Sequence, residues 1–198
     1  LLPNRRLFHD RIRMAISQAR REGARLALLM IDLDNFKPVN DSFGHAVGDL
    51  LLKAVARRMQ NCLRDSDTLA RVGGYEFLVL LPLIRDEIDA MSVADKIRLE
   101  LCQPFTLAGE HEVAIACSIG VAIFPDHGTD EKHMLASADD ALYAAKENGR
   151  NCVQLFDRAL AGHVRKEASR RELPILQLVW RSAYRCGEAS IDREHPEL

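Results

Sequence analysis

Two acids at the end of an apolar run are the first residues whose types and spacing suit chemistry. Asp32 and Asp34 close the segment "ARLALLMIDLD", whose continuous apolar character predicts a strand buried on both faces. Carboxylates in that place, next to free backbone carbonyls, suit a hard cation such as Mg²⁺ that shares its oxygen ligands with phosphates. The two acids would also fit as caps of the helix that follows, so the spacing leaves both roles open.

Asn40 and Asp49 have the side chains needed to recognise a guanine base. A carboxylate accepts hydrogen bonds from the ring N–H and the exocyclic amine of guanine, and an amide serves the remaining donors and acceptors. An asparagine in a turn and an acid near a helix N-terminus would look the same in the sequence. Guanine recognition is therefore a hypothesis at this point.

Gly73 and Gly74 separate two apolar runs in "LARVGGYEFLVLL" and predict a tight β-hairpin. Because they lack a Cβ, they also allow a phosphate to come close to the backbone. Tyr75 and Glu76 follow the glycines. Consecutive strand residues point to opposite faces of a sheet, so we expect Glu76 to face away from the side on which Tyr75 lies.

The elements that must position these residues alternate along the chain. Apolar residues at helical spacing predict helices over residues 3–23, 45–64, 85–102 and 130–149. Apolar and β-rich runs predict strands over residues 24–34, 68–72, 76–81 and 150–156, with two more runs inside 105–125. This order predicts an α+β fold of two layers with an antiparallel-containing sheet, and a ferredoxin-like βαββαβ core fits it.

The composition limits the classes of partner. The 198 residues are 47% hydrophobic and 28% charged, with a formal net charge of -2, which argues against a general nucleic-acid or anionic-membrane binder. The longest apolar run is too short to span a bilayer. The five cysteines are odd in number and show no C-x-x-C spacing, so we expect reduced thiols in a cytoplasmic protein.

Residues 1–156 resemble the GGDEF domain, the diguanylate cyclase family. The resemblance rests on "LPNRRLF", "IDLDNFKPVNDSFGHAVGD", "RVGGYEF", "CSIGVAIFP" and "ADDALYAAKENGRN", in the family's order and spacing. It implies a nucleotide-cyclase palm in which two GTP molecules, one on each of two facing domains, condense to cyclic di-GMP. It also implies Mg²⁺ as the cofactor whenever GTP is bound, and a homodimer or a partner GGDEF domain as the protein partner.

The resemblance assigns roles position by position. Asp32 and the backbone carbonyl of Leu33 would bind metal, Asn40 and Asp49 would bind guanine, Phe36 and Lys37 would hold phosphates, Lys146 and Arg150 would reach the terminal phosphate, and Gly73 and Gly74 would form the signature turn. Arg64 and Asp67 match the family's inhibitory Arg-x-x-Asp site, where a guanidinium binds a guanine or phosphate of cyclic di-GMP. Arg98 or Lys96 would complete that site.

The signature departs from the family at one position. The residue after the two glycines should be an acid that binds metal and is a proposed general base, and here it is Tyr75. A phenol, with a reference pKa of about 10, is protonated at neutral pH and is a poor, bulky ligand for Mg²⁺. Losing one well-placed electrostatic group commonly costs at least ~10²-fold in rate.

We therefore expect a signalling domain with impaired catalysis that binds cyclic di-GMP, GTP or both. Two alternatives stay open. One is a working cyclase in which Asp32, with Asp34 or Glu76, holds the metals. The other is an interaction domain that only dimerises with an active partner.

The C-terminal segment has a different character. Residues 157–173 predict a charged helical linker, and residues 174–198 resemble the start of a hemerythrin-like domain through Trp180, Tyr184 and His195. In that family a histidine at this place is the first ligand of a di-iron site inside a four-helix bundle. The other ligands are absent here, so we expect di-iron only in a longer parent protein. A chance match is the alternative.

Overall fold

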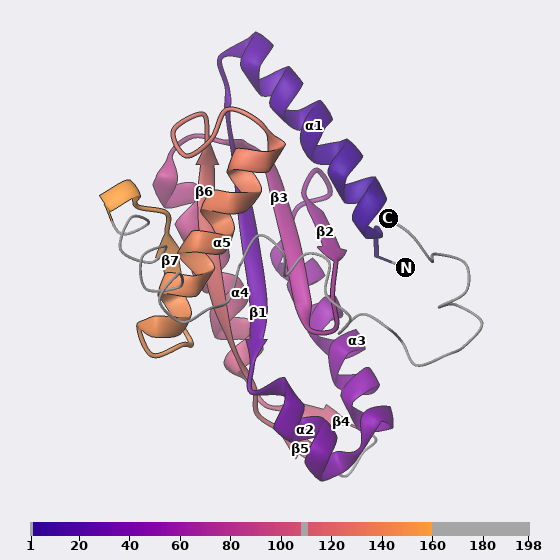
Figure 1. The fold of residues 1–198 in the computed structure, drawn as a ribbon. Helices are drawn as coiled ribbons and strands as arrows, with labels where there is room; N and C mark the ends of the chain where they lie inside the picture. Colours follow the sequence, from indigo (N-terminus) through magenta and orange to yellow (C-terminus); the bar gives the residue numbers. More distant parts are fainter. Residues whose placement is uncertain (1, 108–110, 160–198) are drawn as a thin grey trace, which may run out of the picture. The chain divides into compact units, whose positions relative to one another are not determined.

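The computed structural model describes residues 2–107 and 111–159 of the chain (Figure 1). Most of the predicted linker, the hemerythrin-like segment and His195 lie outside these residues. Within the described part of the chain, no helix is both long enough and apolar enough to cross a membrane.

A five-stranded sheet in the order β2-β3-β1-β6-β7 forms the centre of the fold (Figure 1). Its strands are β1 (Arg25–Asp34), β2 (Thr68–Arg71), β3 (Glu76–Ile84), β6 (Ala116–Phe124) and β7 (Val153–Leu155). Neighbouring strands are antiparallel except for the parallel pair of β6 and β7. The strand predicted to be buried on both faces is β1, which lies in the middle of this sheet.

The order β6-β1-β3-β2 confirms the predicted ferredoxin-like core. α3 (His45–Cys62) connects β1 to β2, and α4 (Glu87–Cys102) connects β3 towards β6. These two helices cover one face of the sheet. α1 (Arg5–Glu22) and α5 (Glu131–Glu147) cover the other face, and β7 extends the sheet beyond β6.

Side chains of β1 alternate between two hydrophobic cores because successive strand residues point to opposite faces. Leu29 and Ile31 belong to the core that includes residues of α3 and α4. Leu26 and Leu28 belong to the core that includes residues of α1 and α5. The same alternation places Asp32 on the α1–α5 face, where the apolar core gives way to polar groups.

Gly120 of β6 lets α5 lie close to the sheet. A Cβ on this residue would stand 2.2 Å from the carbonyl oxygen of Ala138 and 2.2 Å from the backbone nitrogen of Leu142. Both are main-chain atoms, so a side chain at Gly120 would force the helix itself to shift. The close packing fixes where the C-terminal end of α5 lies relative to β1.

Two short elements lie at the lower end of the sheet in Figure 1, beyond the end of β1. The first is α2 (Phe36–Phe43), where the sequence suggested only a turn. Pro38 is tolerated because a proline in the first helical turn loses no intrahelical hydrogen bond. The second is a separate pair of strands, β4 (Phe105–Leu107) and β5 (His111–Val113). Region 105–125 thus holds three strands rather than the two predicted runs.

Candidate functional site

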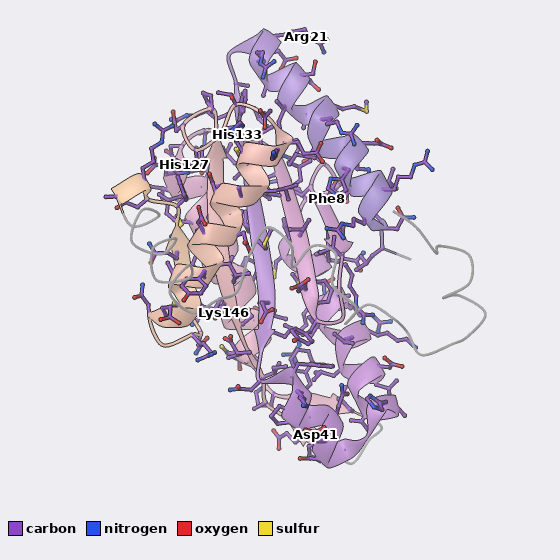
Figure 2. All side chains as sticks on the ribbon, viewed as in Figure 1. Phe8, Arg21, Asp41, His127, His133 and Lys146 are labelled. Atoms are coloured by element: carbon purple, nitrogen blue, oxygen red, sulfur yellow. The ribbon has the colours of Figure 1, made fainter. Side chains whose placement is uncertain are left out.

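The candidate site lies where β1 ends, between the C-terminal end of α5, the β2–β3 hairpin and α2. Figure 2 shows Lys146 on α5 above the junction of β1 and α2, with Asp41 on α2 below it. The predicted metal and phosphate residues come from these elements and from the turn that follows α5, and Asp49, one of the two predicted guanine residues, comes from α3. Sequence positions as far apart as 32 and 146 therefore meet at one end of the sheet.

Asp32 forms an ion pair with Lys146. The distance from Lys146 Nζ to Asp32 Oδ2 is 3.0 Å, and the Asp32 residue is only 5% exposed. Burial raises the pKa of Asp32, and the ammonium group of Lys146 opposes this effect by stabilising the charged form. The structure therefore joins a predicted metal ligand to a predicted phosphate ligand within the described chain.

Asp34 has a different environment from Asp32, although both are buried. The Ser118 hydroxyl contacts both carboxylate oxygens of Asp34, at 2.9 and 3.0 Å, and the Asn151 N–H donates to Oδ2 at 3.0 Å. These bonds tie β1 to β6 and to the turn after α5. Asp34 thus has a structural role in holding the site together. Neither acid caps α2, because the N-cap residue is Asn35.

Glu76 lies opposite Asp32 in the pairing of β3 with β1. Directly paired residues of neighbouring strands share a face of the sheet, so both carboxylates are on the α5 side. The charge of Glu76 contributes to raising the pKa values of Asp32 and Asp139. The alternation of strand residues predicted only that Glu76 faces away from Tyr75. The strand pairing shows in addition that Glu76 lies next to Asp32.

Asp139 was not singled out from the sequence. Burial, followed by the charges of Asp140 and Glu76, raises the pKa of Asp139 to about 6, while Lys146 lowers it. Its seven-residue spacing from Lys146 on α5 places both side chains on one face of the helix, and this spacing was the available signal. The ammonium of Lys146 thus lies in the field of several carboxylates.

The backbone of the signature turn is held from both sides. The Arg71 guanidinium donates to the carbonyl oxygen of Gly74 at 2.7 and 3.1 Å and to that of Gly73 at 3.3 Å. The N–H of Leu33 donates to the carbonyl oxygen of Tyr75 at 3.3 Å. Sequence reasoning missed Arg71. These bonds fix the main chain at position 75 next to β1 whatever side chain it carries.

The Tyr75 side chain packs against the first residue of α2. Its ring centroid lies 6.0 Å from that of Phe36, with the planes inclined by 33°. Tyr75 is 43% exposed, whereas Phe36 is buried. The phenol therefore lies beside the N-terminus of α2, where the resemblance assigns the phosphates.

The two predicted guanine residues come together at the start of α3. The Asn40 amide lies against Gly48, because a Cβ on Gly48 would stand 1.9 Å from Asn40 Oδ1. Asp49 follows Gly48 directly and is exposed. The Asn40 amide thus lies close to the residue before Asp49, and guanine recognition by the two side chains stays a prediction.

The predicted phosphate residues lie on α2, at the end of α5 and in the turn after it. Lys37 is exposed in the first turn of α2, whose free N–H groups suit an anion. Arg150 is exposed and has a left-handed backbone, with φ of 63°, in the turn that follows α5. The N–H of the next residue, Asn151, is the donor to Asp34, which links this turn to β1.

The family model described as "Diguanylate cyclase, GGDEF domain" matches residues 1–152. The chain belongs to the GGDEF family. It is 42% identical over 166 residues to the bifunctional diguanylate cyclase/cyclic di-GMP phosphodiesterase MucR of Pseudomonas aeruginosa. The matched region covers 84% of this chain and 24% of MucR. It is also 40% identical over 156 residues to the diguanylate cyclase TpbB of the same species, and this matched region covers 79% of this chain and 36% of TpbB.

Solved GGDEF domains share the fold. The crystal structure of the GGDEF domain of TpbB superimposes with a TM-score of 0.77 at 39% identity, covering 79% of this chain and 97% of that one. The GGDEF domain of DgcB from Caulobacter crescentus, solved in complex with c-di-GMP, gives 0.72 at 30% identity, covering 79% and 89%. The present chain spans about a quarter to a third of the length of MucR and TpbB.

The loop before the GGDEF hairpin carries the predicted inhibitory residues. The N–H of Arg64 donates to Asp67 Oδ2 at 2.9 Å, and the N–H of Asp67 donates to the Arg64 carbonyl at 3.0 Å. The Arg64 residue is exposed. Burial raises the pKa of Cys62 and the charge of Lys96 opposes this rise, which places Lys96 near the end of α3 and this loop. Lys96 therefore remains a candidate for completing the site.

Arg98, the other candidate for that site, points elsewhere. Its guanidinium donates to Asp95 at 2.7 Å and to the Asn151 side chain at 3.3 Å. Asn151 belongs to the turn before β7, on the opposite edge of the sheet from β2. Arg98 thus stabilises the turn that carries Arg150 rather than the inhibitory loop.

The donor set of this GGDEF domain fits one hard cation. Asp32 and the Leu33 carbonyl are oxygen ligands at the end of β1, and phosphate oxygens commonly complete the shell of Mg²⁺. Within the described residues, no group of three or more His, Cys, Asp or Glu side chains is arranged to hold a metal by itself. With a phenol at Tyr75, the residues do not fit the family's pair of ions.

Proposed function

We propose that this GGDEF domain is a binding module of cyclic di-GMP signalling with impaired cyclase activity. It binds GTP at the end of β1 and cyclic di-GMP at the loop of Arg64 and Asp67. The observation that carries the proposal is the placement of Tyr75: the main chain of the signature turn is held in position, but the side chain is a phenol packed on Phe36.

The loss of catalysis follows from what the site lacks. A neutral phenol is a weak ligand for Mg²⁺, and a carboxylate at this position is the group that the family uses for metal and proton transfer. Asp32 remains, but its carboxylate is paired with Lys146. Asp32 and the Leu33 carbonyl would hold Mg²⁺, and the bound ion would neutralise charge on the phosphates.

The binding functions keep their residues. Asn40, which lies against Gly48, and the neighbouring Asp49 would bind guanine. Lys37 and the N-terminus of α2 would hold phosphates, and Lys146 and Arg150 would reach the terminal phosphate. These groups stabilise a bound nucleotide without taking part in bond breaking. GTP recognition therefore does not depend on the residue that was lost.

Cyclic di-GMP binding is supported by the inhibitory loop. The exposed guanidinium of Arg64 is available for a charge-assisted contact with guanine or phosphate. A GGDEF domain of DgcB, 30% identical to this chain, has been solved in complex with c-di-GMP. We infer that the present loop binds the same ligand.

A working cyclase is the second candidate, and one observation favours it. Glu76 shares a sheet face with Asp32 and lies opposite it in the strand pairing. A carboxylate there would supply some of the negative charge that Tyr75 cannot. In that case turnover would depend on Glu76.

The longer protein is part of the proposal. We propose that the domain works in the cytoplasm, pairs with itself or another GGDEF domain, and precedes a hemerythrin-like domain that begins near residue 174. Iron analysis of a longer version of the protein tests this last point, and about two iron atoms per chain are expected. An iron-free preparation from iron-rich medium would contradict it.

Incubation of the domain with GTP and Mg²⁺ tests the central claim. Chromatography is expected to detect little or no cyclic di-GMP, while calorimetry is expected to show heats of binding for both GTP and cyclic di-GMP. Substantial turnover would contradict the proposal and favour the second candidate. An absence of binding heat for either nucleotide would remove that part of the function.

A further inference from the structure

We propose that Lys146 is an exchangeable counter-ion that makes the binding of a divalent cation and of a terminal phosphate mutually dependent. In the nucleotide-free domain the ammonium group balances Asp32. When a nucleoside triphosphate binds, it moves to the terminal phosphate and leaves Asp32 to a cation. This inference rests on the proposed binding of GTP and specifies how that site distinguishes a triphosphate from a diphosphate.

The starting state is seen directly in the structure. Lys146 Nζ lies 3.0 Å from Asp32 Oδ2, and Asp32 is almost fully buried. A buried carboxylate is strongly destabilised unless a cation accompanies it. The ammonium therefore balances the charge of the carboxylate that would hold a cation.

The pair can exchange because its two members differ in freedom. Asp32 is fixed within the central strand, whereas Lys146 lies in the last turn of α5 and has a flexible four-carbon stem with a partly exposed side chain. Arg150, the other terminal-phosphate residue, follows in the next turn. Only a side-chain rotation, with no movement of the helix, is needed for Lys146 to turn towards that residue.

The neighbouring acids make the exchange selective. Glu76 pairs with Asp32 across the two strands, and its charge contributes to raising the pKa values of Asp32 and Asp139. Removing the ammonium without replacing it would leave several carboxylates without a cation, which is unfavourable. If a cation binds without a terminal phosphate, Lys146 stays on Asp32 and repels it. If a terminal phosphate binds without a cation, it draws Lys146 away and leaves the buried Asp32 carboxylate without a counter-ion. Each therefore strengthens the binding of the other.

A diphosphate provides no such new partner for Lys146. Its two phosphates can occupy the N-terminus of α2, but Lys146 then stays on Asp32. The preference for GTP over GDP is thus expected to depend on the divalent cation. Couplings of this kind are typically about 5- to 150-fold.

The nucleotide-free protein offers the sharpest test, because replacing a basic residue is expected to strengthen cation binding. Mn²⁺ binding is measured at pH 8 by electron paramagnetic resonance for the native domain, Lys146→Met and the control Lys132→Met, which alters an exposed lysine of the same helix. At least ~10-fold tighter binding is expected for Lys146→Met only. The double variant Asp32→Asn/Lys146→Met is expected to lose the gain. Equal binding by Lys146→Met and the native domain would overturn the inference.

Calorimetry with GTP and GDP, with and without Mg²⁺, tests the other half of the exchange. Mg²⁺ is expected to strengthen GTP binding by at least ~5-fold more than GDP binding in the native domain, and this difference is expected to disappear in Lys146→Met. A difference that persists in the variant would contradict the exchange. Thermal unfolding checks that the variant is folded. If the native domain binds no GTP, the proposed function fails, while the Mn²⁺ measurement still decides whether Lys146 excludes the cation.

Discussion

The signature hairpin and the inhibitory loop hold their backbones in similar ways but differ in the side chains that they present. In the hairpin, Arg71 donates to the carbonyls of the two glycines. In the loop, Asp67 accepts the N–H of Arg64. The hairpin presents Tyr75 where the resemblance leads us to expect an acid, whereas the loop presents both of the residues that it leads us to expect. The difference teaches that the backbone of a turn is held separately from the side chains that it presents.

The largest expected effect comes from restoring the acid. In Tyr75→Glu, the held main chain would place a carboxylate beside Asp32 and the Leu33 carbonyl, so cyclase activity is expected to rise by at least ~10²-fold. The measurement is cyclic di-GMP production from GTP and Mg²⁺, with Tyr75→Phe as the matched control that removes only the hydroxyl. Cyclic di-GMP binding at the loop is expected to stay unchanged. Activity that stays at the native level would show that Tyr75 is not what limits the reaction.

A second effect concerns the acids around the hairpin. The pKa of Asp139, raised to about 6 by burial and the charges of Asp140 and Glu76, is higher than the ordinary value of 3.8 for an aspartate. The folded protein therefore binds more protons between these two values, and its stability falls as the pH rises through this window. Asp139→Asn is expected to be more stable than the native domain by about 2 kcal/mol at pH 8 and to differ little at pH 4.

Urea unfolding of the two proteins at both pH values measures this difference. Asp140→Asn, which changes the neighbouring acid of the same helix, is the control and is expected to give a smaller gain. An equal fall in stability between pH 4 and pH 8 for Asp139→Asn and the native domain would contradict the buried charge.

The third effect separates the two binding regions. Arg64→Ala is expected to weaken cyclic di-GMP binding by at least ~10-fold, because it removes charge-assisted hydrogen bonds from the ligand. GTP binding is expected to remain as in the native domain. Calorimetry with both nucleotides measures this, and Arg57→Ala, an exposed arginine on α3, controls for the loss of general positive charge. Equal losses for the two variants would argue against a specific site.

The smallest effect tests the backbone of the loop itself. Asp67→Ala removes the acceptor of the Arg64 N–H and is expected to lower the free energy of unfolding by about 1 kcal/mol. The neighbouring variant Asp65→Ala, at an exposed position, is expected to change it little. If both variants unfold like the native protein, the loop is held by other contacts and its likeness to the hairpin fails.

Much of the fold was predictable because a long apolar pattern indicates which faces of its helix or strand must be buried. The run ending at Asp32 has apolar residues at both odd and even positions, which only a central strand can bury. α2 escaped prediction because it is short and contains Pro38, so no helical period could develop. The division of residues 105–125 into three strands also lacked a signal of its own.

The residues of the candidate site were named from the sequence, whereas their contacts were not. The resemblance supplied Asp32, Lys146 and the glycine pair one by one, whereas their meeting depends on how α5 packs on the sheet. Asp139 was missed although its seven-residue spacing from Lys146 was an available signal, and Arg71 was missed because its hydrogen bonds to the glycine carbonyls form only in the folded hairpin. The assignment of Arg98 was ambiguous because a residue on α4 can face either edge of the sheet, and its contact with Asn151 decides between them.

Because Gly120 has no side chain, α5 packs close to the sheet, and this close packing determines how near Lys146 comes to Asp32. A methyl group there would press on the main chain of α5 and lift the helix from the sheet. The distance between Lys146, near the end of that helix, and Asp32 would then increase. A change deep under the helix, touching no nucleotide, would in this way retune which phosphates the domain prefers.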